Sequence, residues 1–186
     1  MKIVQAALAS QKDDEEHQKN LIVYRLPESL DSVTEARTKD REAVQKLLTA
    51  LNVDSTPVEI RRLGKFDKDT VSNRPRPVKI VLLDRSERDL AMANVSNLAK
   101  VTDDAIKSVQ VNYDLNREQR DKQKALVAEA KELSKNSTTH IWKVRGPPEN
   151  MTTRKFLRRK TDIQADTQAQ ATQNIHTGTT PPQAAS

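Results

Sequence analysis

Basic side chains are concentrated in two stretches of the chain, and these residues give the clearest indication of a chemical function in the sequence. The stretch from Glu59 to Lys79 carries seven Lys and Arg against three acidic residues. A second stretch, from Lys143 to Lys160, carries seven against one. Clusters of this kind bind nucleic-acid phosphates with strong salt dependence and little sequence preference. The alternative is an ordinary solvated surface that happens to be basic, and the presence of two clusters weighs against it.

Arg74 and Arg76, in the first stretch, each precede a proline. A residue before proline is pushed to an extended conformation, so the two side chains are expected on one side of the chain, about 6–7 Å apart. That distance is near the phosphate spacing of a single strand, and the guanidinium fork can hold phosphate oxygens in pairs. We therefore expect both arginines to project from an exposed connection. The alternative is that they pair with Asp67 and Asp69 and close the loop.

Residues able to catalyse a reaction or hold a metal are scattered along the chain. The three histidines lie in three different segments, there is no cysteine, and three glycines are too few for a glycine-rich phosphate cradle. The sequence has no zinc-protease, nucleotide-binding or nucleophile motif. We expect no enzyme activity, catalytic residue, metal site, cofactor or small-molecule substrate.

Composition sets broad limits on the class of protein. Of the 186 residues, 35% are hydrophobic and 31% are charged, which favours one domain of ordinary size with tails. The formal net charge of +6 favours a polyanionic partner, most simply nucleic acid. No apolar run approaches the roughly 20 residues of a membrane span, so no membrane association is expected.

A strand at about Leu21–Tyr24, ended by Pro27, organises the elements that position the basic residues. Both of its faces are apolar, so it is expected at the centre of a sheet. One face would pack on a core, and the other would present Ile22 and Tyr24 to the bases of a ligand. The alternative is an ordinary buried strand.

Helix and strand periodicities then alternate along the chain. Capping-box patterns at Ser32–Glu35 and Asp84–Glu87 open two helices with apolar stripes. The resulting order, β-α-β-β-α-β, predicts an α+β fold over residues 20–113. This is an RRM-like split βαβ arrangement, a four-stranded antiparallel sheet with two helices on one face. The three further strands are expected at 58–63, 78–83 and 109–113.

The remaining segments flank this domain. Residues 1–19 are expected to be a helical leader or coiled-coil remnant able to self-associate, or else a frayed polar segment. Residues 114–158 predict a small C-terminal domain of one helix and a β-hairpin, in which Trp142 is either a core residue or a base-stacking platform. The Thr-, Gln-, Ala- and Pro-rich stretch 159–186 predicts a disordered tail.

Four motifs occur in an order that resembles a known family. They are Asn20–Ser29, the Arg62–Lys65 box, Arg74–Val78 leading into the third strand, and Asp114–Arg120. The chain resembles, over about residues 15–158, the gag-like first-open-reading-frame proteins of LINE-type non-LTR retrotransposons.

The resemblance implies an atypical RNA-recognition fold followed by a small C-terminal domain. It further implies binding of single-stranded RNA and DNA, nucleic-acid chaperone activity, and assembly with the element's RNA into a cytoplasmic ribonucleoprotein that can also be nuclear. By position, it points to Arg62, Arg74, Arg76 and Arg120 as binding residues.

The chain also departs from the family pattern. The aromatic pair of the third-strand RNA motif is missing, which predicts little base preference. The long trimeric coiled coil is absent or reduced to residues 1–19. Because zinc-knuckle, endonuclease and polymerase segments are not present, one interpretation is that the chain is a fragment of a longer protein.

The two basic clusters, the first strand and the family resemblance together define one set of expected nucleic-acid-binding residues. The rival hypothesis is a protein-interaction module that uses the same split βαβ sheet. The expected binding residues are Tyr24, Arg61, Arg62, Lys65, Arg74, Arg76, Lys79, Arg120, Lys143, Arg145, Arg154 and Lys155.

Overall fold

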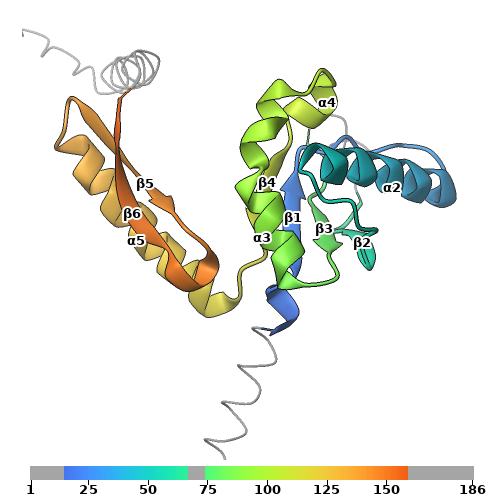
Figure 1. The fold of residues 1–186 in the computed structure, drawn as a ribbon, viewed down its shortest axis with the longest axis horizontal. Coiled ribbons are helices and arrows are strands. Elements are labelled where there is room, and N and C mark those ends of the chain that lie inside the picture. The colour runs from blue at the N-terminus through green and yellow to red at the C-terminus, as the bar shows by residue number, and fades with distance from the viewer. Residues whose placement is uncertain (1–14, 67–73, 159–186) are drawn as a thin grey trace, which may run out of the picture. The chain divides into compact units, whose positions relative to one another are not determined.

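The computed structural model describes residues 15–66 and 74–158 (Figure 1). These residues belong to two compact units that divide between Arg120 and Asp121. The expectations for residues 1–14 and for the tail from residue 159 onward lie outside the described residues, as do Lys68 and the proposed loop acids Asp67 and Asp69.

The first unit is built on a four-stranded antiparallel sheet with the strand order β2-β3-β1-β4. The prediction of an α+β fold with an antiparallel sheet and helices is confirmed, and β1 has a central place in the sheet. The elements are β1 (Asn20–Tyr24), α2 (Val33–Ala50), β2 (Glu59–Arg62), β3 (Val78–Val81), α3 (Arg85–Ala93), the 3-10 helix η1 (Val95–Lys100), α4 (Asp104–Lys107) and β4 (Gln110–Tyr113).

One region of this unit differs from the expected pattern. One helix was expected after the Asp84–Glu87 capping box, but α3 ends at Ala93 and the chain continues as η1 and then α4. The backbone N–H of Asn94 donates to the carbonyls of both Leu90 and Ala91, so the last turn tightens there. Leu98 still reaches the core, because 3-10 geometry also places apolar residues on one side.

The core lies on one face of the sheet, against the helices. Leu21 and Val23 of β1 are fully buried, as strand alternation requires for the face that packs on α2. The predicted leucine stripe of α2 is also buried. The other fully buried apolar residues are Leu26, Val44, Leu47, Leu48, Leu51, Val78, Ile80, Leu82 and Ala91.

Side-chain caps set the starts of the helices. The hydroxyl of Ser32 accepts from the Glu35 N–H at 3.4 Å while the Glu35 carboxylate accepts from the Ser32 N–H at 3.3 Å, so the predicted capping box is confirmed. Asp84 caps α3 by accepting from the Glu87 N–H at 3.0 Å. These caps satisfy backbone donors that the helices leave unpaired.

The second unit consists of most of α5 (Arg117–Lys135) and the hairpin of β5 (His140–Arg145) and β6 (Thr152–Leu157), joined through the short 3-10 helix η2 (Pro148–Asn150). Its buried core is small: Ala130, Pro148 and Met151 are the buried members among its described residues. The Ser134 hydroxyl of α5 accepts from the Trp142 N–H at 2.7 Å and so attaches the hairpin to the helix.

Gly146, at the turn after β5, has a φ of +108°, and a Cβ there would lie 2.4 Å from the Asn150 carbonyl oxygen. Only glycine fits that turn without displacing backbone. Among the described residues, no helix combines the length and apolarity that crossing a membrane requires.

Candidate nucleic-acid interface

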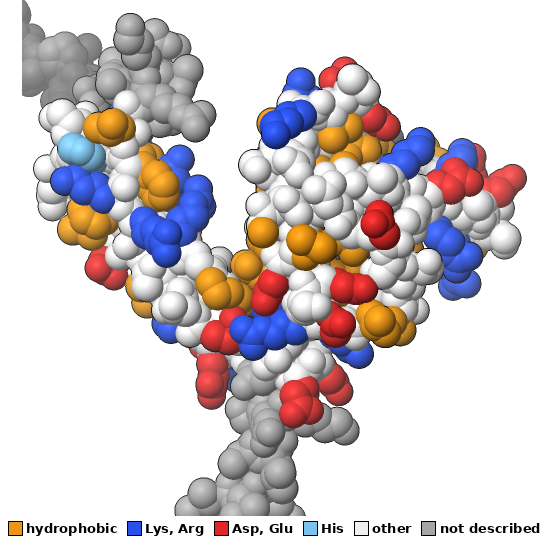
Figure 2. Space-filling view, in the orientation of Figure 1, with side chains coloured by type: hydrophobic (Ala, Val, Ile, Leu, Met, Phe, Trp, Pro, Cys, Tyr) orange, Lys and Arg blue, Asp and Glu red, His pale blue; other side chains and the backbone are white. Residues whose placement is uncertain are grey.

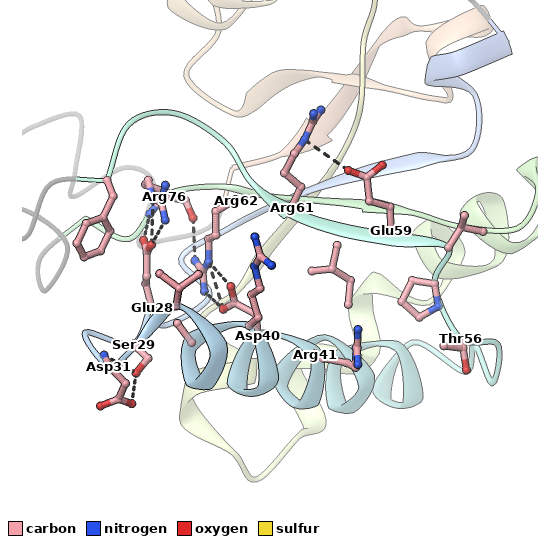
Figure 3. A pocket seen from close by; sticks show the side chains of 17 residues that line it. Glu28, Ser29, Asp31, Asp40, Arg41, Thr56, Glu59, Arg61, Arg62 and Arg76 are labelled. Atoms are coloured by element: carbon pink, nitrogen blue, oxygen red, sulfur yellow. Dashed lines mark hydrogen bonds and ion pairs between the residues drawn. The ribbon is translucent and has the colours of Figure 1, made fainter.

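Arg62 and Arg61 are adjacent in β2 but have opposite environments. Strand alternation points Arg62 toward α2, where its side chain is only 6% exposed and pairs with Asp40, whereas the Arg61 side chain is 59% exposed (Figure 3). Further guanidinium bonds from Arg62 reach the carbonyls of Leu26 at 2.9 Å and Arg76 at 2.8 Å. The geometry therefore gives Arg62 a structural role, and the outward cation of this strand is Arg61.

Arg76 is also held internally. Its Nε donates to Glu28 Oε1 at 2.9 Å, its backbone N–H donates to Glu28 Oε2 at 3.0 Å, and Nη1 donates to the Gly64 carbonyl at 3.1 Å. This corrects the expectation that Arg76 projects freely from the connection between β2 and β3. Within the described residues, Arg76 is bound to Glu28 and to the Gly64 carbonyl, and the alternative pairing with Asp67 and Asp69 lies outside the described residues.

The contact with Arg76 changes the pKa of the Glu28 carboxyl. Burial by itself raises its pKa, but the Arg76 side-chain and backbone bonds, with the charges of Arg62 and Arg76, outweigh burial and hold the pKa of Glu28 below its ordinary value of 4.5. The carboxylate is thus ionised at neutral pH, although its side chain is only 4% exposed.

The sheet face opposite the core carries several of the predicted residues. Cross-strand pairing places Arg61, Lys79, Ile22 and Asn112 in one row across the four strands. Lys79 pairs with Asp114, its Nζ lying 2.9 Å from Oδ2. Ile22 is buried, which corrects the expectation that it is presented to a ligand, whereas Tyr24 is 40% exposed. Tyr24 and Arg61 are therefore the accessible members of the predicted set on this face.

Three further predicted residues lie outside this row. Lys65 and Arg74 are exposed on the two described ends of the β2–β3 connection. Arg120 is exposed in the first turn of α5, where its Nε donates to the Asn116 carbonyl at 3.3 Å. The start of α5 is capped by Asn116, whose Oδ1 accepts from the Gln119 N–H at 2.7 Å.

The outer face of the β5–β6 hairpin collects the basic residues of the second unit. Lys143 lies directly opposite Arg154, and Ile141 lies directly opposite Phe156. The Arg145 guanidinium lies 5.5 Å from the centre of the Phe156 ring. Figure 2 shows basic and hydrophobic side chains next to one another over this hairpin. We call the surface formed by Lys143, Arg145, Arg154 and Phe156 the hairpin face.

No carboxylate of the described residues forms an ion pair with the three cations of the hairpin face. All three are exposed, and Phe156 is 38% exposed beside them. Lys155 alternates to the other side of the strand, opposite Trp142, although it too is exposed. Trp142 is half-buried, which favours its interpretation as a core residue of the hairpin.

Sequence reasoning did not single out Phe156. Its signal was present in the spacing, because Phe156 and Arg154 are two residues apart in an alternating segment and so share a face. Their position opposite Ile141 and Lys143 depends on the hairpin register, which the local pattern does not specify.

The described residues contain no group of three or more His, Cys, Asp or Glu side chains placed to hold a metal ion. In comparisons with known proteins, no protein-family model matches the chain and no curated protein matches it significantly.

Proposed function

We propose that this chain is a single-stranded RNA- and DNA-binding protein that acts mainly through phosphate contacts. In this proposal residues 20–113 are an RRM-like domain and the helix and hairpin are a second binding module. The chain would serve as a chaperone-like component of a LINE-type retrotransposon ribonucleoprotein, in the cytoplasm and also in the nucleus. The resemblance of its motifs to gag-like first-open-reading-frame proteins supports the biological setting.

The observation that carries the proposal is the pairing of Lys143 with Arg154 on the hairpin face. Like charges directly opposite each other across two strands are destabilising. With no carboxylate of the described residues paired to either one, the hairpin retains a repulsion that a bound anion would relieve. A nucleic-acid backbone supplies a row of such anions.

The aromatic ring beside these cations suits a single strand rather than a duplex. Bases of single strands stack on exposed aromatic side chains whatever their sequence, and cations beside the ring bind the phosphates. Phe156 provides the ring, and Lys143 and Arg154 provide the charges. On the sheet face of the first unit, Tyr24 offers an exposed aromatic ring for stacking and Arg61 offers an exposed positive charge for phosphate.

A salt titration with a fluorescently labelled single-stranded RNA tests this function on the full chain. Each phosphate contact contributes about −0.7 to the slope of log affinity against log salt. We expect Lys143→Thr with Arg154→Thr to reduce the magnitude of the slope by about 1.4, since two contacts are lost.

Lys122→Thr with Lys124→Thr is the matched control, because it removes the same charge from exposed positions of α5 in the same unit. This control should change the slope much less than the hairpin variant does. A flat slope for the unaltered chain, or equal effects of the two double variants, would contradict phosphate binding by the hairpin face.

A further inference from the structure

A groove of about 740 Å³ runs between helix α2 and strand β2 of the first unit (Figure 3). Its apolar lining includes Val33, Val58 and Phe66, which are 70%, 63% and 45% exposed. The groove lies along the edge of the sheet where β2 meets α2, and its rim includes Glu59 and Arg61. An apolar lining this exposed, within a polar rim, is typical of an interaction site.

The charges around the groove are not balanced. Three of its carboxylates already have cationic partners: Glu28 pairs with Arg76, Asp40 with Arg62, and Asp31 with Lys39. The fourth, Glu59, lies 3.8 Å from Arg61.

Arg37 and Arg41 also line the groove, and neither forms an ion pair with any described residue. The cationic charge left over after internal pairing therefore lies on the α2 wall.

The spacing on this wall is regular. Val33, Arg37 and Arg41 follow one another at four-residue intervals, so they form one stripe along α2. Four residues advance about 6 Å along a helix axis. Alternate residues of an extended chain are about 6.6 Å apart, so side chains on one face of a strand could meet the three positions of the stripe in turn.

The other wall of the groove is a strand edge. β2 is the terminal strand of the sheet order, so among the described residues it has a strand partner on one side only. The Leu63 N–H donates to the Pro77 carbonyl at 2.8 Å, one position beyond the pair of Arg62 with Val78. Backbone hydrogen bonding in an antiparallel pair alternates along the strand. The backbone N–H and C=O of Arg61 therefore point toward β3, and those of Ile60 point toward the open edge.

The groove suits a peptide better than a nucleotide base. Phe66 is the one aromatic side chain in its lining, and the Arg76 guanidinium lies 5.2 Å from the centre of its ring. That ring face is already occupied, while the unpaired strand edge offers hydrogen bonds to an extended backbone.

We propose that this groove binds an extended acidic peptide segment of a protein partner, added as a strand along the open edge of β2. Two carboxylates two residues apart contact Arg37 and Arg41, and an apolar residue two positions further on contacts Val33. Backbone bonds to Ile60 set the register of the peptide. This site is independent of the hairpin face and needs no nucleic acid.

Selection from a displayed library of random short peptides on the full chain tests the proposal. We expect the enriched peptides to share an acidic–x–acidic pattern flanked by an apolar residue. Synthetic copies should bind Arg37→Glu with Arg41→Glu at least about tenfold more weakly, equivalent to about 1.4 kcal/mol. Lys46→Glu with Lys100→Glu is the control, because it reverses the same charge at exposed positions outside the groove.

Backbone chemistry of the selected peptides gives a second readout. N-methylation of one alternate set of amides should abolish binding, and N-methylation of the other set should leave it unchanged, because only every second amide of the peptide faces β2. The proposal is overturned if no such pattern is enriched, if both charge-reversed variants bind alike, or if methylation is harmless in both registers. It is equally overturned if single-stranded RNA displaces the peptides and loses its own binding in Arg37→Glu with Arg41→Glu.

Discussion

The guanidinium group of Arg62 is hydrogen-bonded to the carboxylate of Asp40, with Nε 3.2 Å from Oδ1 and 3.1 Å from Oδ2. The same group donates to the carbonyls of Leu26, Pro27 and Arg76. One side chain of the edge strand thereby holds together α2, the turn after β1 and the chain that enters β3. Because these bonds use the donors of the guanidinium, Arg62 stabilises the fold around the groove.

We expect Arg62→Ala to lower the free energy of unfolding by about 3–5 kcal/mol, the usual cost of removing one partner of a buried ion pair. The reason is that Asp40 and three backbone carbonyls lose their donor together. Urea unfolding of the first unit, followed by circular dichroism, measures the change.

Arg61→Ala is the matched control for this prediction. Arg61 is exposed on the opposite face, so its loss should change stability by no more than about 0.5 kcal/mol. Equal destabilisation by the two substitutions would show that the pairing of Arg62 with Asp40 contributes little.

The contact of Glu28 with Arg76 predicts a loss of stability in acid. The folded state holds the pKa of Glu28 below 4.5, so this group's contribution is fully present above pH 4.5. It declines as the pH falls through the folded-state pKa, because protonation removes the charge that Arg76 binds. Unfolding free energies measured from neutral pH down to acid should therefore fall more steeply for the unaltered chain than for Glu28→Gln.

The stability difference between the two proteins should be constant above pH 4.5 and should narrow below it. The same measurement on Asp31→Asn provides a comparison at an exposed carboxyl. The pKa of Asp31 is also lowered, through its bonds with Lys39 and Ser29. A difference between the unaltered chain and Glu28→Gln that stays constant throughout the acid range would refute the assignment.

Lys143 and Arg154 should repel each other measurably in the absence of a ligand. A double-mutant cycle with Lys143→Thr and Arg154→Thr is expected to give a repulsive coupling of about 0.2–1 kcal/mol that shrinks as salt is added. Fluorescence of Trp142, the single tryptophan, reports unfolding of the hairpin itself. An attractive coupling, or one that salt leaves unchanged, would contradict the observation that carries the proposed function.

Base identity should matter little to nucleic-acid binding. The third strand presents Lys79 and Val81 outward where stacking aromatics would select bases, and phosphate contacts do not discriminate among sequences. In competition among RNA homopolymers, we expect affinities within about a hundredfold, or about 2.7 kcal/mol, of one another. A larger preference for one base would show that a base-reading pocket exists.

The sequence by itself determined the elements whose signals are local. Ser32 and Glu35 are only three residues apart in the sequence, so their capping contact is local and the start of α2 could be predicted. The leucine stripe of α2 and the apolar strand β1 were predictable for the same reason, since their periodicity is a property of consecutive residues.

Only the tertiary structure decided which basic residues are available to a ligand. Arg61 and Arg62 are identical in type and adjacent in sequence, but the partner of Arg62 is Asp40, 22 residues away, and that of Arg76 is Glu28, 48 residues away. Whether an arginine is neutralised depends on which carboxylate the folded chain brings within bonding distance, and sequence spacing does not contain that distance. The hairpin face follows the same rule, because register across two strands, rather than order along one, placed Lys143 against Arg154.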